Sequence, residues 1–254
     1  MLSSAAAPAA PSCFPASSAP QPAPCRASPA LDPAWLWRAD TMASTSGLTW
    51  STGYPALDAE LPGGGWPAPG LTELLLAQPG SGELRLLAPV LRGLVRPVLW
   101  VAPPLQPHAP ALQQGGLPLD GLVWARPSSD TDAVWAAEQA LRSRSCAAVL
   151  WWGDAAPPVW RRLHLAAQDG GCVLWALRPA GARGQPSAAP LRLAIAPAPG
   201  EQLAVEVFKR RGPAMARPIL LSLPAILPAA RRVVVPTGES SHAVARAAPA
   251  LVAA

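Results

Sequence analysis

Lysine is nearly absent from this chain, and phenylalanine and tyrosine are scarce. Among 254 residues there is one lysine, Lys209, with two phenylalanines and one tyrosine. Charged residues make up only 14% of the chain, and almost all of the basic charge is arginine. The net charge of +5 is modest for this length, so it permits contact with nucleic acid or an acidic partner without requiring either.

Cysteine and long hydrophobic runs are also lacking. The four cysteines have no metal-ligand spacing, which excludes a disulfide framework and a zinc site and favours a reducing cytoplasm. No apolar run reaches about 18 residues without charge or proline, so we expect no membrane span. The first charged residue is Arg26, and we therefore expect no secretory signal and a cytoplasmic protein.

Proline and alanine, by contrast, are abundant and mark both ends of the chain. There are 34 prolines. We predict an Ala/Pro-rich disordered tail over residues 1–45, interrupted by WLWRAD at residues 35–40, and a flexible tail over residues 226–254, because such segments bury too little apolar surface to offset the entropy of ordering. Residues 46–225 form the predicted folded domain.

Within this domain, short apolar runs alternate with segments of helical periodicity. We predict strands over residues 71–76, 97–102, 121–126, 147–152, 172–177, 191–196, 202–210 and 217–223. We predict helices over residues 55–61, 83–95, 130–143 and 158–171. This order indicates an α/β fold with a mostly parallel sheet, helices on both faces and a C-terminal antiparallel hairpin.

The stretch AQPGSGEL at residues 77–84 has the frame of a phosphate-binding loop without its chemistry. A working loop reads G-x-x-x-x-G-K-[ST], with a lysine for the phosphate charge and a hydroxyl for magnesium. The corresponding positions here are Ala77, Gly80, Ser81, Gly82, Glu83 and Leu84. The anion at Glu83 repels phosphate, so we hypothesise that it acts as a built-in anion in an empty phosphate site.

The other positions that ATP hydrolysis needs are also altered. Trp151 and Trp152 occupy the end of the strand where a metal-binding acid is expected, and Asp154 follows as a loop or helix-cap carboxylate. No water-activating glutamate follows the strand at 97–102. We therefore predict a protein that is not an enzyme and that has no cofactor and no metal.

Several phrases in a fixed order resemble a known family. STGYPALDAELPGGGWP, PGSGEL and VEVFKRRG are similar to the entry and the late hairpin of a RecA-type core over roughly residues 49–223. With WRAD upstream, they resemble the ImuA family. The resemblance implies an accessory role in damage-induced, error-prone translesion DNA synthesis. It also implies as partners an ImuB-like inactive Y-family polymerase homologue, RecA, and an error-prone replicative-type polymerase, at the nucleoid when active.

Candidate contact residues are basic or aromatic. Trp35, Trp37 and Arg38 are predicted to form a docking motif, with packing onto the chain's own domain as the alternative. Weak or indirect DNA contact is assigned to Arg178 and Arg183, in a segment that otherwise reads as a solvated linker. The basic run is Lys209, Arg210 and Arg211, for which a binding edge and a solubilising edge are equally open.

Two further alternatives remain open at this point. Of Trp66, Trp135 and Trp160, which lie in a turn and two helices, at least one is expected to face a partner, because tryptophan is enriched among interface anchors. A cell-division inhibitor of the SulA type, which binds the tubulin-like septum protein, has a similar degenerate core and is the alternative function.

Overall fold

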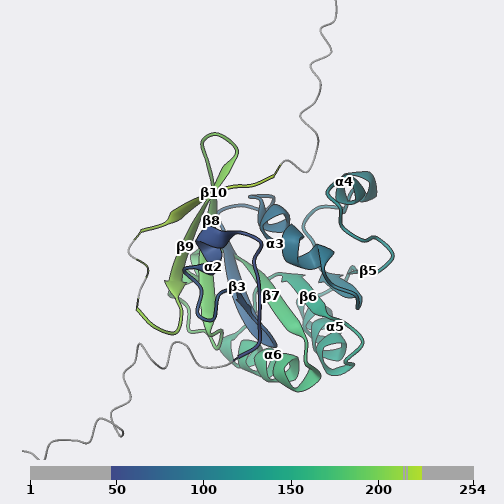
Figure 1. Ribbon diagram of the computed structural model, residues 1–254. Coiled ribbons are helices and arrows are strands. Elements are labelled where there is room, and N and C mark those ends of the chain that lie inside the picture. The colour runs from purple at the N-terminus through teal and green to yellow at the C-terminus, as the bar shows by residue number, and fades with distance from the viewer. Residues whose placement is uncertain (1–46, 214, 216, 225–254) are drawn as a thin grey trace, which may run out of the picture. The chain divides into compact units, whose positions relative to one another are not determined.

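A computed structural model describes residues 47–213, 215 and 217–224 (Figure 1). The two predicted tails, and with them Trp35, Trp37 and Arg38, lie outside the described residues. The described part is an α/β structure with one large sheet and helices on both of its faces. The predicted fold class is therefore confirmed.

Every strand and helix predicted from periodicity is present. The strands are β1 (Thr49–Trp50), β2 (Trp66–Pro67), β3 (Gly70–Leu76), β4 (Val98–Val101), β5 (Leu122–Ala125), β6 (Ala148–Trp152), β7 (Val173–Pro179), β8 (Leu191–Ala198), β9 (Gln202–Lys209) and β10 (Ile219–Ser222). The helices are α2 (Pro55–Asp58), α3 (Glu83–Arg92), α4 (Ala109–Gln114), α5 (Asp130–Arg142), α6 (Pro157–Gly170) and the short 3₁₀ helix η2 (Ala180–Gly184). The sequence analysis missed α4, η2 and the ribbon of β1 and β2, which are all too short to show a period.

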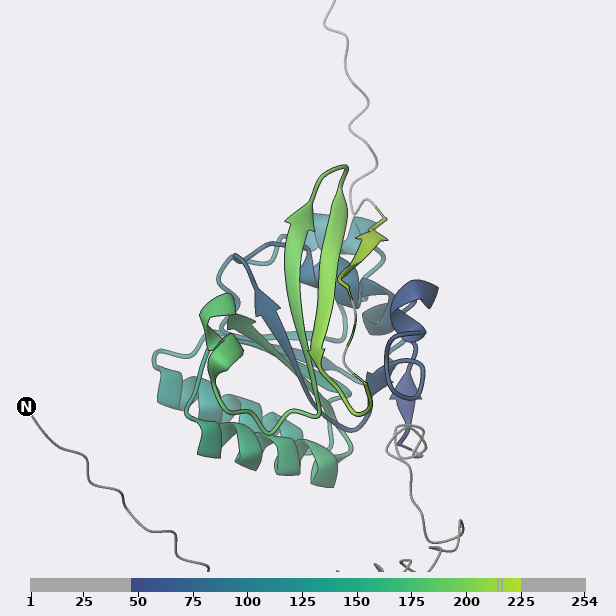
Figure 2. The ribbon, with the colours of Figure 1, turned by 90° about the vertical axis from the view of Figure 1, so that its left-hand side faces the viewer.

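The large sheet has the strand order β10-β9-β8-β3-β7-β6-β4-β5. The strands from β8 to β5 run parallel, whereas β9 pairs antiparallel with both β8 and β10. Figure 2 shows the long β8–β9 hairpin with η2 beside it. The central strands β3 and β7 are almost wholly buried, and their sequences are apolar except at Thr72, Glu73 and Arg178.

Apolar side chains fill a core on each face of the sheet. Trp175 and Leu74 belong to the core under α3, and Leu174 and Trp151 belong to the core under α5 and α6. Figure 1 shows α5 and α6 side by side on one face and α3 on the other. The loop after β3 therefore lies between a buried strand and a helix packed on the sheet.

A proline inside α3 is accommodated by the turn that precedes α2. Pro89 has no N–H, so the carbonyl of Arg85 lacks its usual partner within the helix. The hydroxyl of Tyr54 donates to that carbonyl at 2.9 Å. Gly53 has φ +81°, and a Cβ atom there would overlap Pro89. The STGY phrase thus supplies the hydrogen bond that α3 lacks, and the helix continues through Pro89.

Asp58 explains why STG and LD occur together in the same phrase. Its carboxylate accepts hydrogen bonds from Ser51 Oγ at 2.7 Å and from the backbone N–H of Thr52 at 2.8 Å. Leu57 beside it is fully buried. The phrase is therefore a self-contained turn that fixes the chain before β3.

Candidate functional site

The loop between β3 and α3 binds a carboxylate of its own chain. Gly80 N–H donates to Oε1 of Glu83 at 3.0 Å, and Gly82 N–H donates to Oε2 at 3.1 Å. Gly80 has φ +79° and Gly82 has φ +106°, a region that favours glycine. Glu83 is the first residue of α3 and only 4% exposed. Its position at a helix N-terminus is one that a negatively charged side chain stabilises.

The rest of the loop is also held by contacts within itself. Ser81 Oγ donates to the carbonyl of Gln78 and accepts from its N–H at 3.2 Å. Leu84, which stands at the hydroxyl position, packs partly buried against the core under α3. Ala77 is exposed, and its N–H donates to the carbonyl of Ile195 at 3.2 Å. The backbone donors that a phosphate loop offers are thus partly satisfied by Glu83.

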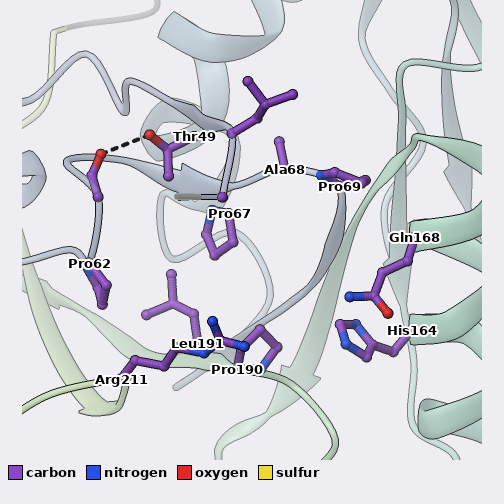
Figure 3. Close-up of a pocket in the computed structure, with 13 residues that line it drawn as sticks. Thr49, Pro62, Pro67, Ala68, Pro69, His164, Gln168, Pro190, Leu191 and Arg211 are labelled. Atoms are coloured by element: carbon purple, nitrogen blue, oxygen red, sulfur yellow. Dashed lines mark hydrogen bonds between the residues drawn. The ribbon is translucent and has the colours of Figure 1, made fainter. Parts of the chain in front are cut away.

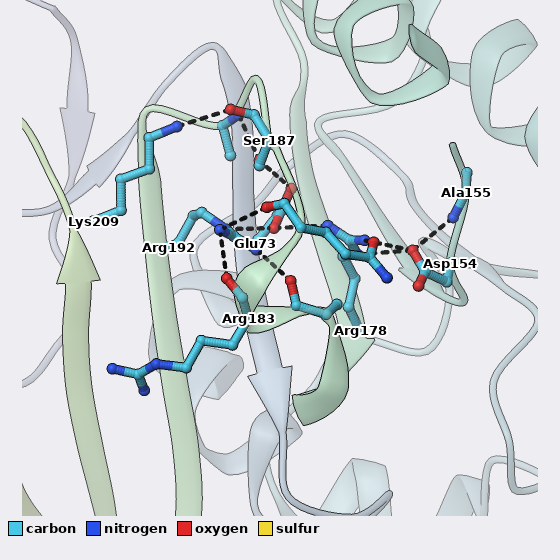
Figure 4. A network of polar contacts seen from close by, with 11 residues as sticks. Glu73, Asp154, Ala155, Arg178, Arg183, Ser187, Arg192 and Lys209 are labelled. Atoms are coloured by element: carbon cyan, nitrogen blue, oxygen red, sulfur yellow. Dashed lines mark hydrogen bonds and ion pairs between the residues drawn. The ribbon is translucent and has the colours of Figure 1, made fainter. Parts of the chain in front are cut away.

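A second polar cluster lies beneath η2, on the face of the sheet that α6 covers, and Figure 4 shows its contacts. At its centre is Glu73 in β3, which is fully buried. Its Oε2 accepts from Arg178 at 3.0 Å and from Arg192 at 2.8 Å, and its Oε1 accepts from Ser187. In the register of the sheet, Glu73 lies opposite Arg192 of β8. We call Glu73, Asp154, Arg178 and Arg192 the buried ion network.

Asp154, the carboxylate after β6, belongs to this network. Its Oδ1 accepts from Nε of Arg178 at 3.0 Å and from Nη2 at 2.5 Å. Asp154 is therefore a carboxylate of the loop between β6 and α6, which was one of its two expected roles, and it is not a helix cap. Asp154 lies at the surface, with its side chain 36% exposed, and it adds a second negative charge to the one that buried Glu73 supplies for the two guanidinium groups.

The buried ion network corrects one predicted DNA contact. Arg178 is 1% exposed, and its guanidinium also contacts Gln185 and the ring of Trp160. It cannot reach a phosphate on the surface. The sequence analysis missed Glu73 and Arg192, although a lone glutamate in LTELLL and an arginine in the neighbouring apolar strand are the signal of a buried pair.

The remaining basic candidates are on or near the surface, and two of them are paired. Arg183 forms a bidentate pair with Glu206 at 2.7 and 2.5 Å and stacks on Phe208. Glu206, in turn, has its pKa lowered by the Arg183 hydrogen bonds. Arg210 pairs with Glu60 at 2.8 Å.

Lys209 and Arg211 stand on either side of Arg210. Lys209 donates to the carbonyl of Ser187 at 2.8 Å, and burial followed by the nearby Arg192 lowers its pKa. Arg211 is exposed and makes no hydrogen bond or ion pair with another described residue. The basic run therefore leaves one guanidinium available to a ligand within the described part of the chain.

A pocket of about 360 Å³ lies at the amino ends of β3 and β8. The Glu83 loop, by contrast, follows the carboxyl end of β3. Figure 3 shows His164 and Gln168 of α6 on one side and Pro62 and Arg211 on the other. Nδ1 of His164 accepts from the N–H of Leu71 at 3.2 Å. Burial, and then the charge of Arg211, lower the pKa of His164.

The three tryptophans of which at least one was expected to face a partner differ in how far they are buried. Trp66 and Trp160 are fully buried, whereas Trp135 on α5 is 64% exposed. Trp135 thus stands out on the helix surface away from the core, and it is the member of this group that a partner can reach.

Two general properties of the described part bear on the kind of site. Within residues 47–213, 215 and 217–224, no three or more His, Cys, Asp or Glu side chains group as metal ligands. None of the helices in that part has the length and apolar character needed to cross a bilayer.

Comparison with known proteins gives two kinds of match. No family model matches the chain. ImuA proteins from two strains of Caulobacter vibrioides are 32% identical over 167 residues, which is 59% of this chain and 68% of theirs. A crystal structure of SulA from Pseudomonas aeruginosa is 25% identical and covers 42% of this chain and 97% of its own, with a TM-score of 0.37. At that score the structural likeness carries no argument.

Proposed function

The chain belongs to the ImuA family, and from this premise we propose that it is a non-catalytic accessory protein of damage-induced, error-prone translesion DNA synthesis. It acts through protein contacts with an ImuB-like inactive polymerase homologue, and RecA and an error-prone replicative-type polymerase are further partners. The protein works in the cytoplasm and joins the nucleoid when it is active.

The observation that carries the non-catalytic part is the position of the Glu83 carboxylate. It accepts from two of the loop N–H groups that would hold a phosphate. A phosphate oxygen about 4 Å from this carboxylate would be repelled by about 4 kcal/mol at an effective dielectric of about 20. The carboxylate that could hold magnesium, Asp154, is paired with Arg178. Both features oppose the binding of ATP and magnesium.

The burial and pairing of two arginines that were predicted to contact DNA favour protein contact over direct DNA contact. Arg178 is buried, and Arg183 is paired with Glu206. Neutralising phosphates requires free cations, and these two are already neutralised by carboxylates. Any DNA contact through this segment is therefore weak or indirect.

A genetic experiment tests the role in mutagenesis. A strain lacking the gene is irradiated with ultraviolet light, and mutation frequency and cell length are scored in the same cultures. The proposal expects induced mutation to be lost while filamentation stays normal. Normal induced mutation with a failure to delay division would contradict it and favour the SulA-type septum inhibitor.

A biochemical experiment tests the role of Glu83. We expect the wild-type protein to bind no ATP at concentrations up to about 1 mM, the weak end of specific affinities. Replacing Glu83 by alanine leaves two loop N–H groups without their acceptor and should lower the free energy of unfolding by about 1.5–3 kcal/mol.

The matched control for Glu83→Ala is Gln78→Ala in the same loop. Gln78 takes part in the loop through its backbone, so this change should alter stability by less than about 0.5 kcal/mol. Urea unfolding measures both variants, and calorimetric titration measures ATP. Equal stability of the two variants, or tight ATP binding by the wild type, would overturn the assignment of Glu83 as the anion of the loop.

A further inference from the structure

The pocket at the amino edge of the sheet has rigid apolar walls. Pro62, Pro67, Pro69 and Pro190 line it together with Leu48 and Leu191. Proline fixes its own φ angle, so these walls lose little freedom when a ligand binds. The volume of about 360 Å³ is within the range of ligand-binding pockets and is large enough for an aromatic side chain with its neighbours.

Hydrogen-bond donors are placed around these apolar walls. Because Nδ1 of His164 accepts from the N–H of Leu71, the neutral ring carries its proton on Nε2 and can donate. Gln168 lies one turn further along α6 and offers an amide NH₂. Arg211 adds a positive charge from the other side of the pocket (Figure 3). Donors and a cation around an apolar pocket select a ligand that combines an apolar group with an anion.

The rim of the pocket favours a polypeptide over a small molecule. Leu48 lines the pocket and is nevertheless 79% exposed, so apolar surface continues out of the cavity. A small ligand that filled the cavity would leave this surface in water, whereas an extended peptide would cover it. Arg211, which follows the end of β9, makes that side of the rim positive.

We propose that this pocket is the docking site for an acidic segment of a protein partner, in which an aromatic or large apolar side chain lies next to a carboxylate. The apolar side chain enters between the proline walls, and the carboxylate pairs with Arg211 at the rim. The identity of the partner, an ImuB-like protein, rests on the proposed function. The chemistry of the segment rests on the pocket alone. It adds a specific surface to the protein contacts proposed above.

A peptide titration tests the chemistry of the pocket. The probe is a fluorescein-labelled peptide with the core Asp-Trp-Leu-Asp, and its control is the same peptide with both aspartates changed to asparagine. Fluorescence anisotropy measures binding to the full chain. We expect the acidic peptide to bind at least about tenfold more tightly than the neutral one, since complementary charge sets specificity. Equal affinities would overturn the proposal.

Two variants of the protein locate the binding. Arg211→Gln should weaken binding of the acidic peptide at least about tenfold, and Leu48→Ala should weaken binding of both peptides. The matched control is Arg161→Gln, which removes a charge that is also exposed, on α6 and outside the pocket, and should leave affinity unchanged. All three residues are exposed, so each variant should fold as the wild type. Loss of affinity in the Arg161 variant, or none in the Arg211 variant, would place the binding elsewhere.

A second measurement separates this inference from the proposed function. The purified ImuB-like partner is titrated onto the wild type and onto Arg211→Gln. If the partner binds both equally, the protein-contact function stands and the pocket assignment is wrong. If the partner binds neither while the acidic peptide binds the wild type, the pocket assignment stands and the proposed partner is wrong.

Discussion

Glu73 is a charged residue in a strand whose seven residues are all buried. Its carboxylate lies between two guanidinium groups, those of Arg178 and Arg192, which are themselves almost wholly buried. Desolvating these charges is unfavourable, and only the mutual pairing offsets the cost. The network therefore stabilises the fold only while every member is present.

The first prediction concerns this carboxylate. Glu73→Gln removes the charge but keeps the shape, and it leaves two arginines without full compensation in the interior. We expect the free energy of unfolding to fall by about 3–5 kcal/mol, measured by urea denaturation. The control is Glu206→Gln, which breaks the half-exposed pair with Arg183 and should cost no more than about 1 kcal/mol. A similar loss in both variants would contradict this account.

His164 gives a second prediction, for the dependence of stability on pH. Burial and Arg211 lower its pKa in the folded state, whereas the unfolded chain has a value near about 6.5. The unfolded state therefore takes up the proton first as the pH falls. The contribution is fully present above about pH 6.5 and is lost below it, with a slope of at most about 1.4 kcal/mol per pH unit.

Thermal melting between about pH 7.5 and 5.5 measures this slope, because the window covers the unfolded pKa of histidine and stays above those of the carboxylates. In His164→Leu the slope should flatten, since no titrating group remains at that position. Gln168→Leu changes the same wall of the pocket without removing an ionisable group and should keep the slope. A slope that survives in His164→Leu would show that another group causes it.

At the scale of single elements, α3 and α5 depend on different parts of the chain. α3 continues through Pro89 because Tyr54, from a turn earlier in the sequence, supplies a hydrogen bond to Arg85. α5 begins with its own cap, since Ser129 Oγ accepts from the N–H of Asp132 at 3.1 Å. The start of α5 therefore depends on residues next to it in the chain, whereas the continuity of α3 depends on a residue 31 positions away.

The outer face of α5 gives a third prediction. Trp135 is 64% exposed, and a substitution at such a surface position should change stability by less than about 0.5 kcal/mol. Tryptophan is nevertheless the residue most often found to dominate binding energy at interfaces. We expect Trp135→Ala to weaken binding of the ImuB-like partner at least about tenfold, measured by titration of the purified proteins.

The control for Trp135→Ala is Trp160→Ala on the neighbouring helix. Trp160 is fully buried and packs 4.7 Å from Trp151 between ring centroids, so its loss should lower stability by about 3–5 kcal/mol. If Trp135→Ala binds the partner as tightly as the wild type, this face of α5 is not an interface.

On the scale of the whole described part, the polar groups at the carboxyl ends of the parallel strands are paired, whereas those at the amino ends line an open pocket. At the carboxyl edge, where nucleotide-binding folds of this class hold their ligands, Glu83 and Asp154 are engaged by the chain's own donors. At the amino edge, a pocket with Arg211 and His164 is open to solvent. Polar groups are thus available at the amino ends of the strands, whereas Glu83 and Asp154 at the carboxyl ends are paired within the chain.

Much of this arrangement was predictable from the sequence because it depends on local patterns. Apolar runs and helical spacing set the α/β order, since burial on a sheet imposes a period on each element. The glutamate at position 83, where a working phosphate loop has lysine, was visible in the loop sequence alone. The family was recognisable from phrases such as STGYPALD, whose contacts join residues only a few positions apart.

Only the tertiary structure decided which charged and aromatic residues are available to a partner. Arg178 and Arg183 are indistinguishable in the sequence, but Arg178 pairs with a buried glutamate that is 105 residues away in the chain. Trp135 and Trp160 both lie on amphipathic helices, and only packing determined that one is exposed. Burial is set by contacts between distant segments, and no local pattern encodes them. The sequence by itself therefore determined the longer strands and helices and the charge of the loop after β3, while the tertiary structure determined which side chains are exposed.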